Sequence, residues 1–282
     1  MSPLLTLKVH EAMLAAASQG ATALDCSLDL DRSMTTVTLD ATGWQWRQQR
    51  YPFLDGCKDR TIYHWITETF EPVARYSQSL IKLVPTQWGA PTFEIDGIKM
   101  LPTAQVSPYE DARRKVALIE PRGKRVLDTC GGLGYFAAAC LQSGAARIES
   151  YEKNPDVIWL RSLNPWSPQA ADDPDDRLTL HNGDIDVEIA IIADDSVDAV
   201  LHDPPRFGIA GELYSQRFYD HLARVLKRNG LLFHYTGTPN RLTSGRDVPA
   251  EVTKRLQTAG FSVRPNGDGL LAQKRARRGL RL

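Results

Sequence analysis

Hydrophobic and polar residues follow two different patterns along the 282-residue chain, and the change falls near residue 107. Before that point, short runs alternate apolar and polar positions, as at Leu24, Cys26 and Leu28, with turn signals such as Asp96-Gly97 between the runs. Because successive side chains of a strand point to opposite faces, this alternation predicts half-buried β-strands. A helix is expected over residues 7–18, ahead of the strands. Residues 1–106 are therefore predicted to form a small β-rich domain, a candidate for substrate recognition.

Beyond residue 107, apolar runs of strand length alternate with segments of helical period. This order is typical of a mostly parallel sheet covered by helices on both faces. The sequence thus predicts an α/β domain over residues 107–273, followed by a basic tail at 274–282. The expected strands are 125–128, 147–151, 178–182, 197–201 and 231–235, and the expected helices are 109–119, 135–142, 155–163, 215–226 and 248–259.

The charges cancel over the whole chain, with 34 basic and 34 acidic side chains. Five of the basic residues lie in the tail, which leaves 29 basic against 34 acidic side chains in residues 1–273, a net charge of −5. A zero net charge excludes a protein that binds nucleic acid by bulk charge, although a local basic patch remains available.

Targeting and metal-binding patterns are missing from the sequence. No run of about 18 apolar residues occurs, and the N-terminal segment does not resemble a signal peptide, so we expect a cytoplasmic protein without a membrane span. The four cysteines form no CxxC pair and the six histidines form no HExxH pattern. Reduced thiols and the absence of a bound metal are therefore expected.

A glycine-rich turn follows the first strand of the α/β domain. The strand 125–128 ends in Asp128, and the sequence Thr-Cys-Gly-Gly-Leu-Gly then leads into the predicted helix at Tyr135. Glycine tolerates positive φ and lets a ligand approach the backbone closely. Ligands of open α/β sheets bind at this carboxyl end of the strands. Taken alone, the cluster is equally consistent with a tight turn.

Acidic residues follow four successive predicted strands, at Asp128, Glu152, Asp184 and Asp203. In a parallel sheet these four side chains meet at one edge. A phosphate site favours backbone N–H groups rather than carboxylates, because anions repel one another. Several carboxylates instead suit a ligand with hydroxyl groups, an ammonium and a sulfonium but no phosphate, which describes S-adenosylmethionine.

These motifs resemble the seven-strand, Rossmann-like class I S-adenosylmethionine-dependent methyltransferases over roughly residues 107–270. The resemblance implies that Asp128 lies near the methionine portion of the cofactor and that Gly132 and Gly134 let this portion approach the backbone. It also implies that Glu152 binds the ribose and Asp184 the adenine amino group.

The sequence departs from the family at Cys130, where the family usually has its first glycine. This departure leaves the geometry of the turn open, although Gly131 is adjacent. The set of cofactor-binding residues implied by the resemblance is completed by Cys130, Tyr135, Lys153, Ile185 and Asp203.

The predicted strand 197–201 is followed by His202, then Asp203, Pro204 and Pro205. Two prolines have fixed φ and no N–H, so a stiff loop leaves the strand with the Asp203 carboxylate and the Pro204 carbonyl as acceptors. Such a pair suits a planar amino group. Accepting its hydrogens favours the pyramidal nitrogen that attacks a methyl group, without a strong general base.

The segment resembles the (Asp/Asn/Ser)-Pro-Pro-(Tyr/Phe/Trp) motif of amino-directed DNA and RNA methyltransferases. The fourth position is Arg206 here, with Phe207 next, and an arginine plane also stacks on a base or contacts phosphate. The predicted catalytic residues are Asp203, Pro204, Pro205, Arg206 and Phe207.

Flanking segments resemble a mainly archaeal family of predicted methyltransferases, which is associated with N4 methylation of cytidine in small-subunit ribosomal RNA. The resemblance implies RNA as the partner, and the basic tail is a candidate phosphate contact. The matching segments are 94–98, 108–111, 127–130, 163–167, 202–206, 211–215, 233–235 and 245–249.

Other interpretations remain open. A methyltransferase acting on a small-molecule or protein amine is one, and an aminopropyltransferase-like enzyme is a weaker one, since Asp203 lacks the upstream acidic partner of the polyamine motif. A non-catalytic nucleic-acid-binding module of the same fold is a third. The third glycine position of a dehydrogenase motif is Ala137 here, but a dehydrogenase is disfavoured by the Asp-Pro-Pro strand end and not by the glycine loop alone. The pattern does not choose between a monomer and a homodimer.

Overall fold

The computed structural model describes residues 2–237 and 247–275, and the chain divides into two compact units. The first unit contains Met1–Asp111 and Trp159–Ser167, and the second contains Ala112–Ile158 and Pro168–Leu282. The domain boundaries expected at residues 106 and 273 remain predictions. Of the predicted basic tail, residues 276–282 lie outside the described part of the chain.

Residues 2–106 of the first unit form helix α1 and three small antiparallel sheets, which confirms the predicted β-rich region with its leading helix. Helix α1 (Leu7–Ser18) begins at Thr6, whose hydroxyl accepts a hydrogen bond from Val9 N. The sheets have the strand orders β1-β6-β7, β2-β3-β4-β5 and β11-β10-β9-β8. Their strands are β1 (Leu4–Leu5), β2 (Ala23–Cys26), β3 (Thr35–Asp40), β4 (Gly43–Trp46), β5 (Gln49–Pro52), β6 (Tyr63–Ile66), β7 (Thr69–Pro72), β8 (Ala74–Tyr76), β9 (Leu80–Val84), β10 (Thr92–Ile95) and β11 (Ile98–Lys99).

Aromatic side chains form the core of this first unit. The indole of Trp44 is fully buried and stacks on Tyr51 with ring centroids 4.3 Å apart. Phe70 packs beside both rings. Large rings bury much apolar surface in a small domain. These residues therefore stabilise the fold of the first unit and do not form an exposed binding surface.

The second unit is built around a seven-stranded sheet of order β14-β13-β12-β15-β16-β18-β17, which confirms the predicted Rossmann-like α/β fold. The first five strands in this order are parallel, and β18 runs antiparallel to both of its neighbours. The strands are β12 (Arg125–Asp128), β13 (Arg147–Glu152), β14 (Leu178–Asn182), β15 (Val197–His202), β16 (Leu226–Tyr235), β17 (Phe261–Asn266) and β18 (Gly269–Lys274).

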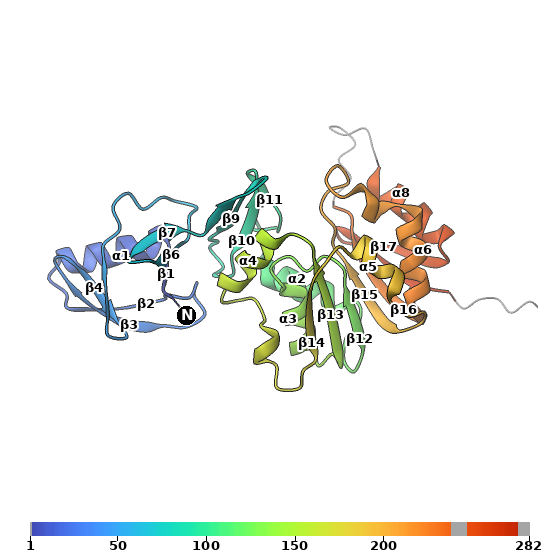
Figure 1. Ribbon diagram of the computed structural model, residues 1–282, viewed down its shortest axis with the longest axis horizontal. Helices are drawn as coiled ribbons and strands as arrows, with labels where there is room; N and C mark the ends of the chain where they lie inside the picture. Colours follow the sequence, from blue (N-terminus) through green and yellow to red (C-terminus); the bar gives the residue numbers. More distant parts are fainter. Residues whose placement is uncertain (1, 238–246, 276–282) are drawn as a thin grey trace, which may run out of the picture. The chain divides into compact units, whose positions relative to one another are not determined.

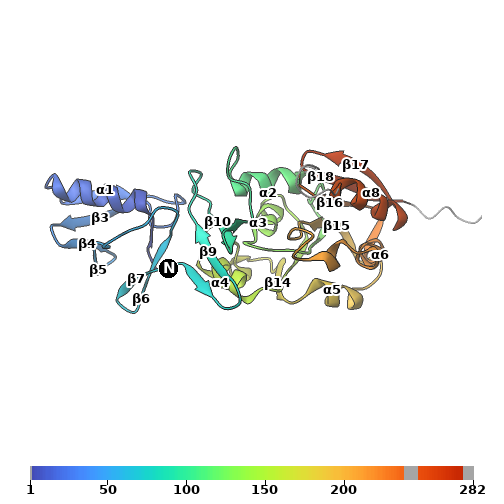
Figure 2. The same ribbon diagram turned by 90° about the horizontal axis from the view of Figure 1, so that it is seen from above.

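Helices pack along this sheet, with α3 beside β12 and β13, and with α6 and α8 at the end formed by β16, β17 and β18 (Figures 1 and 2). None of the helices in residues 2–237 and 247–275 is long and apolar enough to cross a membrane. The remaining elements are α2 (Pro108–Ala117), α3 (Tyr135–Gln142), α4 (Pro155–Leu163), α5 (Ile185–Glu188), α6 (Gln216–Val225), α8 (Val248–Thr258) and the short 3-10 turns η1 (Ala170–Asp172), η2 (Ile189–Ile191) and η3 (Gly211–Tyr214).

The end of the chain differs from the sequence expectation in two places. Strand β16 begins at Leu226 instead of residue 231, because Leu226 already pairs with Val197 before the register shifts. Lys274, assigned to the basic tail, is the last residue of β18, and its ammonium lies 2.6 Å from the Asp195 carboxylate. Pairing with β17 extends strand β18 through this residue, so Lys274 is part of the sheet.

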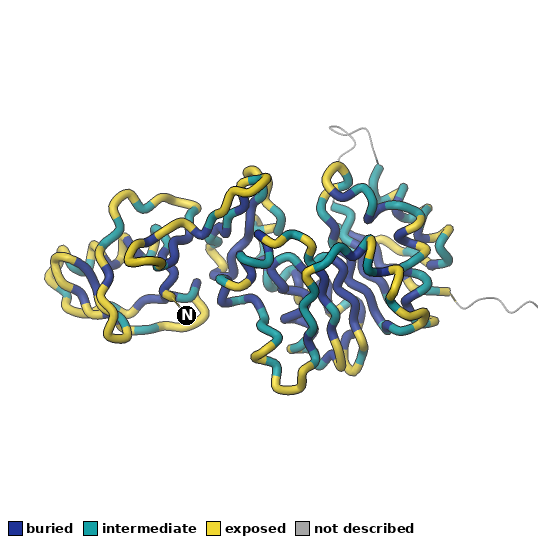
Figure 3. The backbone as a smooth tube through the Cα atoms, viewed as in Figure 1, coloured by how far each residue is buried: buried dark blue, intermediate teal, exposed yellow. Residues whose placement is uncertain are grey.

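The central strands are buried on both faces, as Figure 3 shows for the middle of the sheet. Val126, Leu127, Val200 and Leu201 are at most 1% exposed, which explains their continuous apolar runs. The order of strands reverses between β12 and β15, because the chain runs from β12 outward to β14 and then returns to β15. In open α/β sheets, ligands bind beyond the carboxyl ends of the strands at this switch point.

Candidate active site

The glycine turn after β12 requires glycine at two positions only. The φ angles of Gly132 and Gly134 are 49° and 80°, whereas Cys130 is not among the residues with positive φ. Gly131 N donates to Tyr151 O at 2.7 Å, which ties the turn to β13. Cys130 therefore occupies a position that a side chain tolerates, and the departure from the family pattern does not break the turn.

The Glu152 carboxylate is oriented by the backbone around it. Gly132 N donates to one of its oxygens at 3.0 Å and Asn154 N donates to the other at 2.9 Å. These two bonds join the end of β13 to the glycine turn and fix the plane of the carboxylate. A carboxylate has about four lone-pair sites, and one that is held in a fixed plane is suited to chelating a pair of hydroxyl groups.

Asp128 lies in the interior at the end of β12, with no exposed surface. The Ser150 hydroxyl donates to its carboxylate at 2.8 Å. Burial raises the pKa of the neighbouring Cys130 thiol well above its usual range, and the carboxylates of Glu152, Asp128 and Asp203 raise it further. The thiol is therefore neutral, and three of the four predicted strand-end acids surround it.

The fourth acid, Asp184, begins helix α5 and accepts a hydrogen bond from Asp186 N at 3.0 Å. Its second oxygen lies 3.4 Å from the Lys153 ammonium, which also contacts the Glu212 carboxylate at 3.0 Å. Burial by itself would lower the pKa of Lys153, but the two carboxylates outweigh it and raise that pKa. Lys153 thus links the end of β13 to both α5 and η3.

Two residues expected to bind the cofactor have buried side chains. Ile185 is 3% exposed and belongs to the hydrophobic cluster of the second unit, and Tyr135, the first residue of α3, is 4% exposed. Neither side chain therefore presents a surface to a ligand.

The Asp-Pro-Pro loop begins where β15 ends, beside the glycine turn. Asp128 of β12 pairs with Leu201, so Asp203 follows two residues beyond that pair. Asp203 is partly buried, Pro204 is buried and Arg206 is exposed. Phe207 is half-buried and packs on the hydrophobic cluster of this unit. Of the two residues considered for stacking on a base, Arg206 is therefore the accessible one.

A buried polar network underlies this loop, and sequence patterns did not reveal it. The side chains of His202 and His234 are both fully buried. The Thr129 hydroxyl lies 2.7 Å from His202 Nδ1, and His202 Nε2 lies 3.1 Å from Leu213 O. Tyr219 O–H lies 3.0 Å from His234 Nε2. The sequence signal for this network is limited to polar residues within apolar strands.

The buried histidines should make stability depend on pH. Burial lowers the pKa of His234 to about 3 and that of His202 well below its usual value of 6.5. Between pH 6.5 and 3 the unfolded chain therefore binds more protons than the folded one, and the free energy of unfolding falls as the pH falls. We expect His234→Gln to reduce this slope by up to about 1.4 kcal/mol per pH unit, measured by urea unfolding at several pH values. His221→Gln on α6 is the control, and an unchanged slope in His234→Gln would contradict the expectation.

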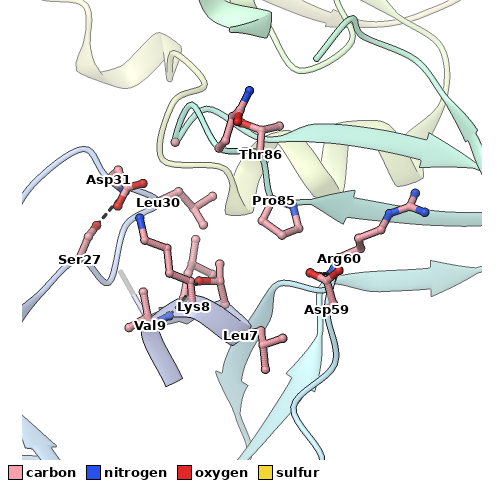
Figure 4. A pocket seen from close by; sticks show the side chains of 14 residues that line it. Leu7, Lys8, Val9, Ser27, Leu30, Asp31, Asp59, Arg60, Pro85 and Thr86 are labelled. Atoms are coloured by element: carbon pink, nitrogen blue, oxygen red, sulfur yellow. Dashed lines mark hydrogen bonds between the residues drawn. The ribbon is translucent and has the colours of Figure 1, made fainter. Parts of the chain in front are cut away.

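Other parts of the described chain offer no competing site. Across residues 2–237 and 247–275, no group of three or more His, Cys, Asp or Glu side chains is arranged to hold a metal ion. A cavity of about 240 Å³ lies in the first unit, with Lys8, Ser27 and Asp31 toward one end and Asp59 and Arg60 toward the other (Figure 4). Its two acidic and two basic side chains balance, and it contains none of the predicted site residues.

Comparisons with known proteins agree on the fold. No protein-family profile matches the chain. It is 44% identical over 181 residues to the uncharacterized protein MJ1233 of Methanocaldococcus jannaschii, covering 64% of this chain and 61% of that protein. It is 30% identical over 140 residues to a polyamine aminopropyltransferase of Pyrobaculum calidifontis, covering 48% of each. The chain thus spans less than two thirds of the length of these curated relatives.

Solved structures give the same picture. Spermidine synthase from Thermotoga maritima superposes with a TM-score of 0.54 at 17% identity, over 71% of each chain. A spermidine synthase in complex with a transition-state analogue superposes with a TM-score of 0.57 at 18% identity, over 71% of this chain and 72% of that one. The chain therefore has the fold of the class I S-adenosylmethionine-dependent transferases, which includes methyltransferases and aminopropyltransferases. A shared fold does not by itself decide the reaction, the acceptor or the group transferred.

Proposed function

We propose that this protein is an S-adenosylmethionine-dependent methyltransferase that acts on an exocyclic amino group of a nucleobase, namely N4 of cytidine in ribosomal RNA. The observation that carries the proposal is the position of Asp203, Pro204 and Pro205 directly after β15, beside the glycine turn of β12. This is the switch point of the sheet, where class I folds bring cofactor and acceptor together.

The residues at the ends of β12 and β13 fit S-adenosylmethionine. Gly132 and Gly134 give the turn its left-handed backbone, and Glu152 presents a carboxylate whose plane is fixed by two N–H groups. Glu152 would hold the ribose hydroxyls and Asp184 the adenine amino group. When bound, S-adenosylmethionine supplies a methyl group on a positively charged sulfur, so transfer forms a carbon–nitrogen bond, breaks a carbon–sulfur bond and leaves a neutral thioether.

Asp203 and Pro204 would act on the acceptor. The carboxylate and the carbonyl accept the two hydrogens of the amino group, which orients the nitrogen and directs its lone pair at the methyl carbon. As the bond forms, the nitrogen gains positive charge, which the Asp203 carboxylate stabilises before the proton leaves to that carboxylate or to water. This chemistry needs no metal ligand from the chain.

RNA is the proposed partner because of Arg206 and the sequence resemblance. Arg206 is exposed immediately after Pro205, where a guanidinium plane would stack on the target base or contact a phosphate. An exposed arginine at this point fits recognition of a base presented from a single-stranded loop. We also propose that the protein acts in the cytoplasm.

Aminopropyl transfer to a polyamine is the second candidate. It is favoured by the likeness to a named polyamine aminopropyltransferase and to spermidine synthases. The carboxylates Asp203, Asp184 and Glu212 would also attract a cationic amine. Decarboxylated S-adenosylmethionine would then be the donor.

One experiment separates these activities. Purified protein is incubated with methyl-labelled S-adenosylmethionine and ribosomal RNA from cells lacking the gene, and the RNA is digested to nucleosides for mass spectrometry. A parallel reaction contains decarboxylated S-adenosylmethionine and putrescine. Labelled N4-methylcytidine supports the proposal, whereas spermidine alone supports the second candidate.

Two further outcomes would also overturn the proposal. Label found only on small amines or protein would indicate a different acceptor. Failure to bind either donor by calorimetry would indicate a non-catalytic nucleic-acid-binding module.

A further inference from the structure

We propose that Tyr214 is a positioning residue that holds the Asp-Pro-Pro loop so that the Pro204 carbonyl faces the amino acceptor. This inference rests on the proposed function. Tyr214 is the last residue of η3 and is 4% exposed. Its hydroxyl lies 3.0 Å from Pro205 O and 3.5 Å from Pro204 O. Because one hydroxyl carries one proton, the short bond goes to Pro205, and the Pro204 carbonyl keeps its acceptor capacity.

The loop needs such a donor from another element. Pro204 and Pro205 have no N–H groups, so the loop cannot be held by its own backbone donors at these positions. The turn that follows is held by Ile209 N and Ala210 N, which donate to Arg206 O at 2.7 Å and 3.3 Å. Upstream of that turn, the Tyr214 hydroxyl donates to the Pro205 carbonyl from outside the loop.

Tyr214 and the residue before it, Leu213, are fixed by contacts to three elements. Arg255 of α8 donates to Tyr214 O at 2.8 Å, and the Tyr214 ring lies against His234 of β16, with ring centroids 5.6 Å apart. His202 Nε2, at the end of β15, lies 3.1 Å from Leu213 O. Since His202 directly precedes Asp203 and Leu213 directly precedes Tyr214, both ends of the loop are joined by one imidazole.

The ring of Tyr214 also limits the loop sterically. Phe207 meets it edge to face, with centroids 5.5 Å apart. Burial raises the pKa of the Tyr214 phenol, and the charge of Asp203 raises it further. The phenol therefore stays protonated at neutral pH and acts as a hydrogen-bond donor. The phenol therefore has the protonation state that a positioning donor needs and not that of a general base.

Tyr214→Phe tests this role because it removes the hydroxyl and keeps the ring. We expect kcat for methyl transfer to fall about 10-fold, since a displaced contact group costs one to two orders of magnitude in rate, while the Kd for S-adenosylmethionine stays within about 2-fold. Hydrogen exchange at the amides of Ile209 and Ala210 should become faster, because their turn follows the released carbonyls.

Tyr219→Phe is the matched control. It removes another buried hydroxyl, 3.0 Å from His234 Nε2, that does not contact the loop. We expect this variant to lose thermal stability with kcat and the exchange of the loop amides unchanged. Equal losses of kcat in the two variants, or wild-type kcat and exchange in Tyr214→Phe, would overturn the inference.

The two proposals fail in different ways. If the wild type transfers no methyl group to ribosomal RNA, the proposed function is wrong. Faster exchange at Ile209 and Ala210 in Tyr214→Phe alone would still support Tyr214 as the residue that holds the loop, and unchanged exchange would still overturn it.

Discussion

Replacing Asp203 with alanine should reduce methyl transfer to RNA by about 10³-fold while the Kd for S-adenosylmethionine changes by no more than about 2-fold. The carboxylate is partly buried directly after β15, where the proposed mechanism has it stabilise the charge that develops on the acceptor nitrogen. Removing one well-placed electrostatic group from an active site costs about 10²–10³-fold in rate. Single-turnover transfer measures the rate, and calorimetry measures cofactor binding.

Asp198→Ala provides the control on the same strand. Its carboxylate lies at the opposite end of β15, accepting from Arg125 N at 2.9 Å and from the Lys227 ammonium at 2.7 Å. This variant should lower stability but not the rate of transfer at saturating substrate. If Asp203→Ala lost binding and transfer equally, Asp203 would serve the cofactor rather than the acceptor.

Replacing Glu152 with alanine should weaken S-adenosylmethionine binding by about 100-fold. The side chain would no longer bind the ribose, and Gly132 N and Asn154 N would lose their acceptor. Hydrogen bonds to a charged group contribute about 1.5–3 kcal/mol each, and about 2.7 kcal/mol corresponds to the expected change in Kd. The transfer rate at saturating cofactor should change much less than the affinity.

Glu149→Ala is the matched variant for this measurement. Glu149 lies on the same strand, β13, and its carboxylate contacts Arg147 Nε and His181 Nε2, each at 2.6 Å. Its carboxylate is directed at Arg147 and His181 and not at the glycine turn, so its removal should leave cofactor affinity unchanged. Equal weakening by both variants would indicate a general effect of β13 on the fold instead of a ribose contact at Glu152.

Local sequence patterns predicted much of the second unit. The bounds of β12, α3, α4 and β14 agree with the expected ranges. Each of these elements is delimited by a local signal, namely an apolar run, the glycine turn or Pro155. The strand-end acids were also recognised in advance. Parallel pairing of β12, β13, β14 and β15 brings them to one edge, as their positions after the strands required.

Contacts between distant segments were not predictable in this way. Strands β17 and β18 did not stand out, since their residues pair with each other and with β16 rather than following a strong local pattern. Lys153 could be placed beside Glu152, but not against Glu212, which is 59 residues away. The Tyr214 hydroxyl likewise donates to Pro205 O only because η3 folds back against the loop.

The sequence alone therefore determined the α/β class of the second unit, the strand-end carboxylates and the Asp-Pro-Pro loop, since each depends on residues close together in the chain. The tertiary structure decided how those groups are held: the orientation of Glu152, the buried histidines and the donor to the proline carbonyls. The physical reason is that hydrogen bonds across a sheet depend on strand order and register, and many residues spread along the chain set these together.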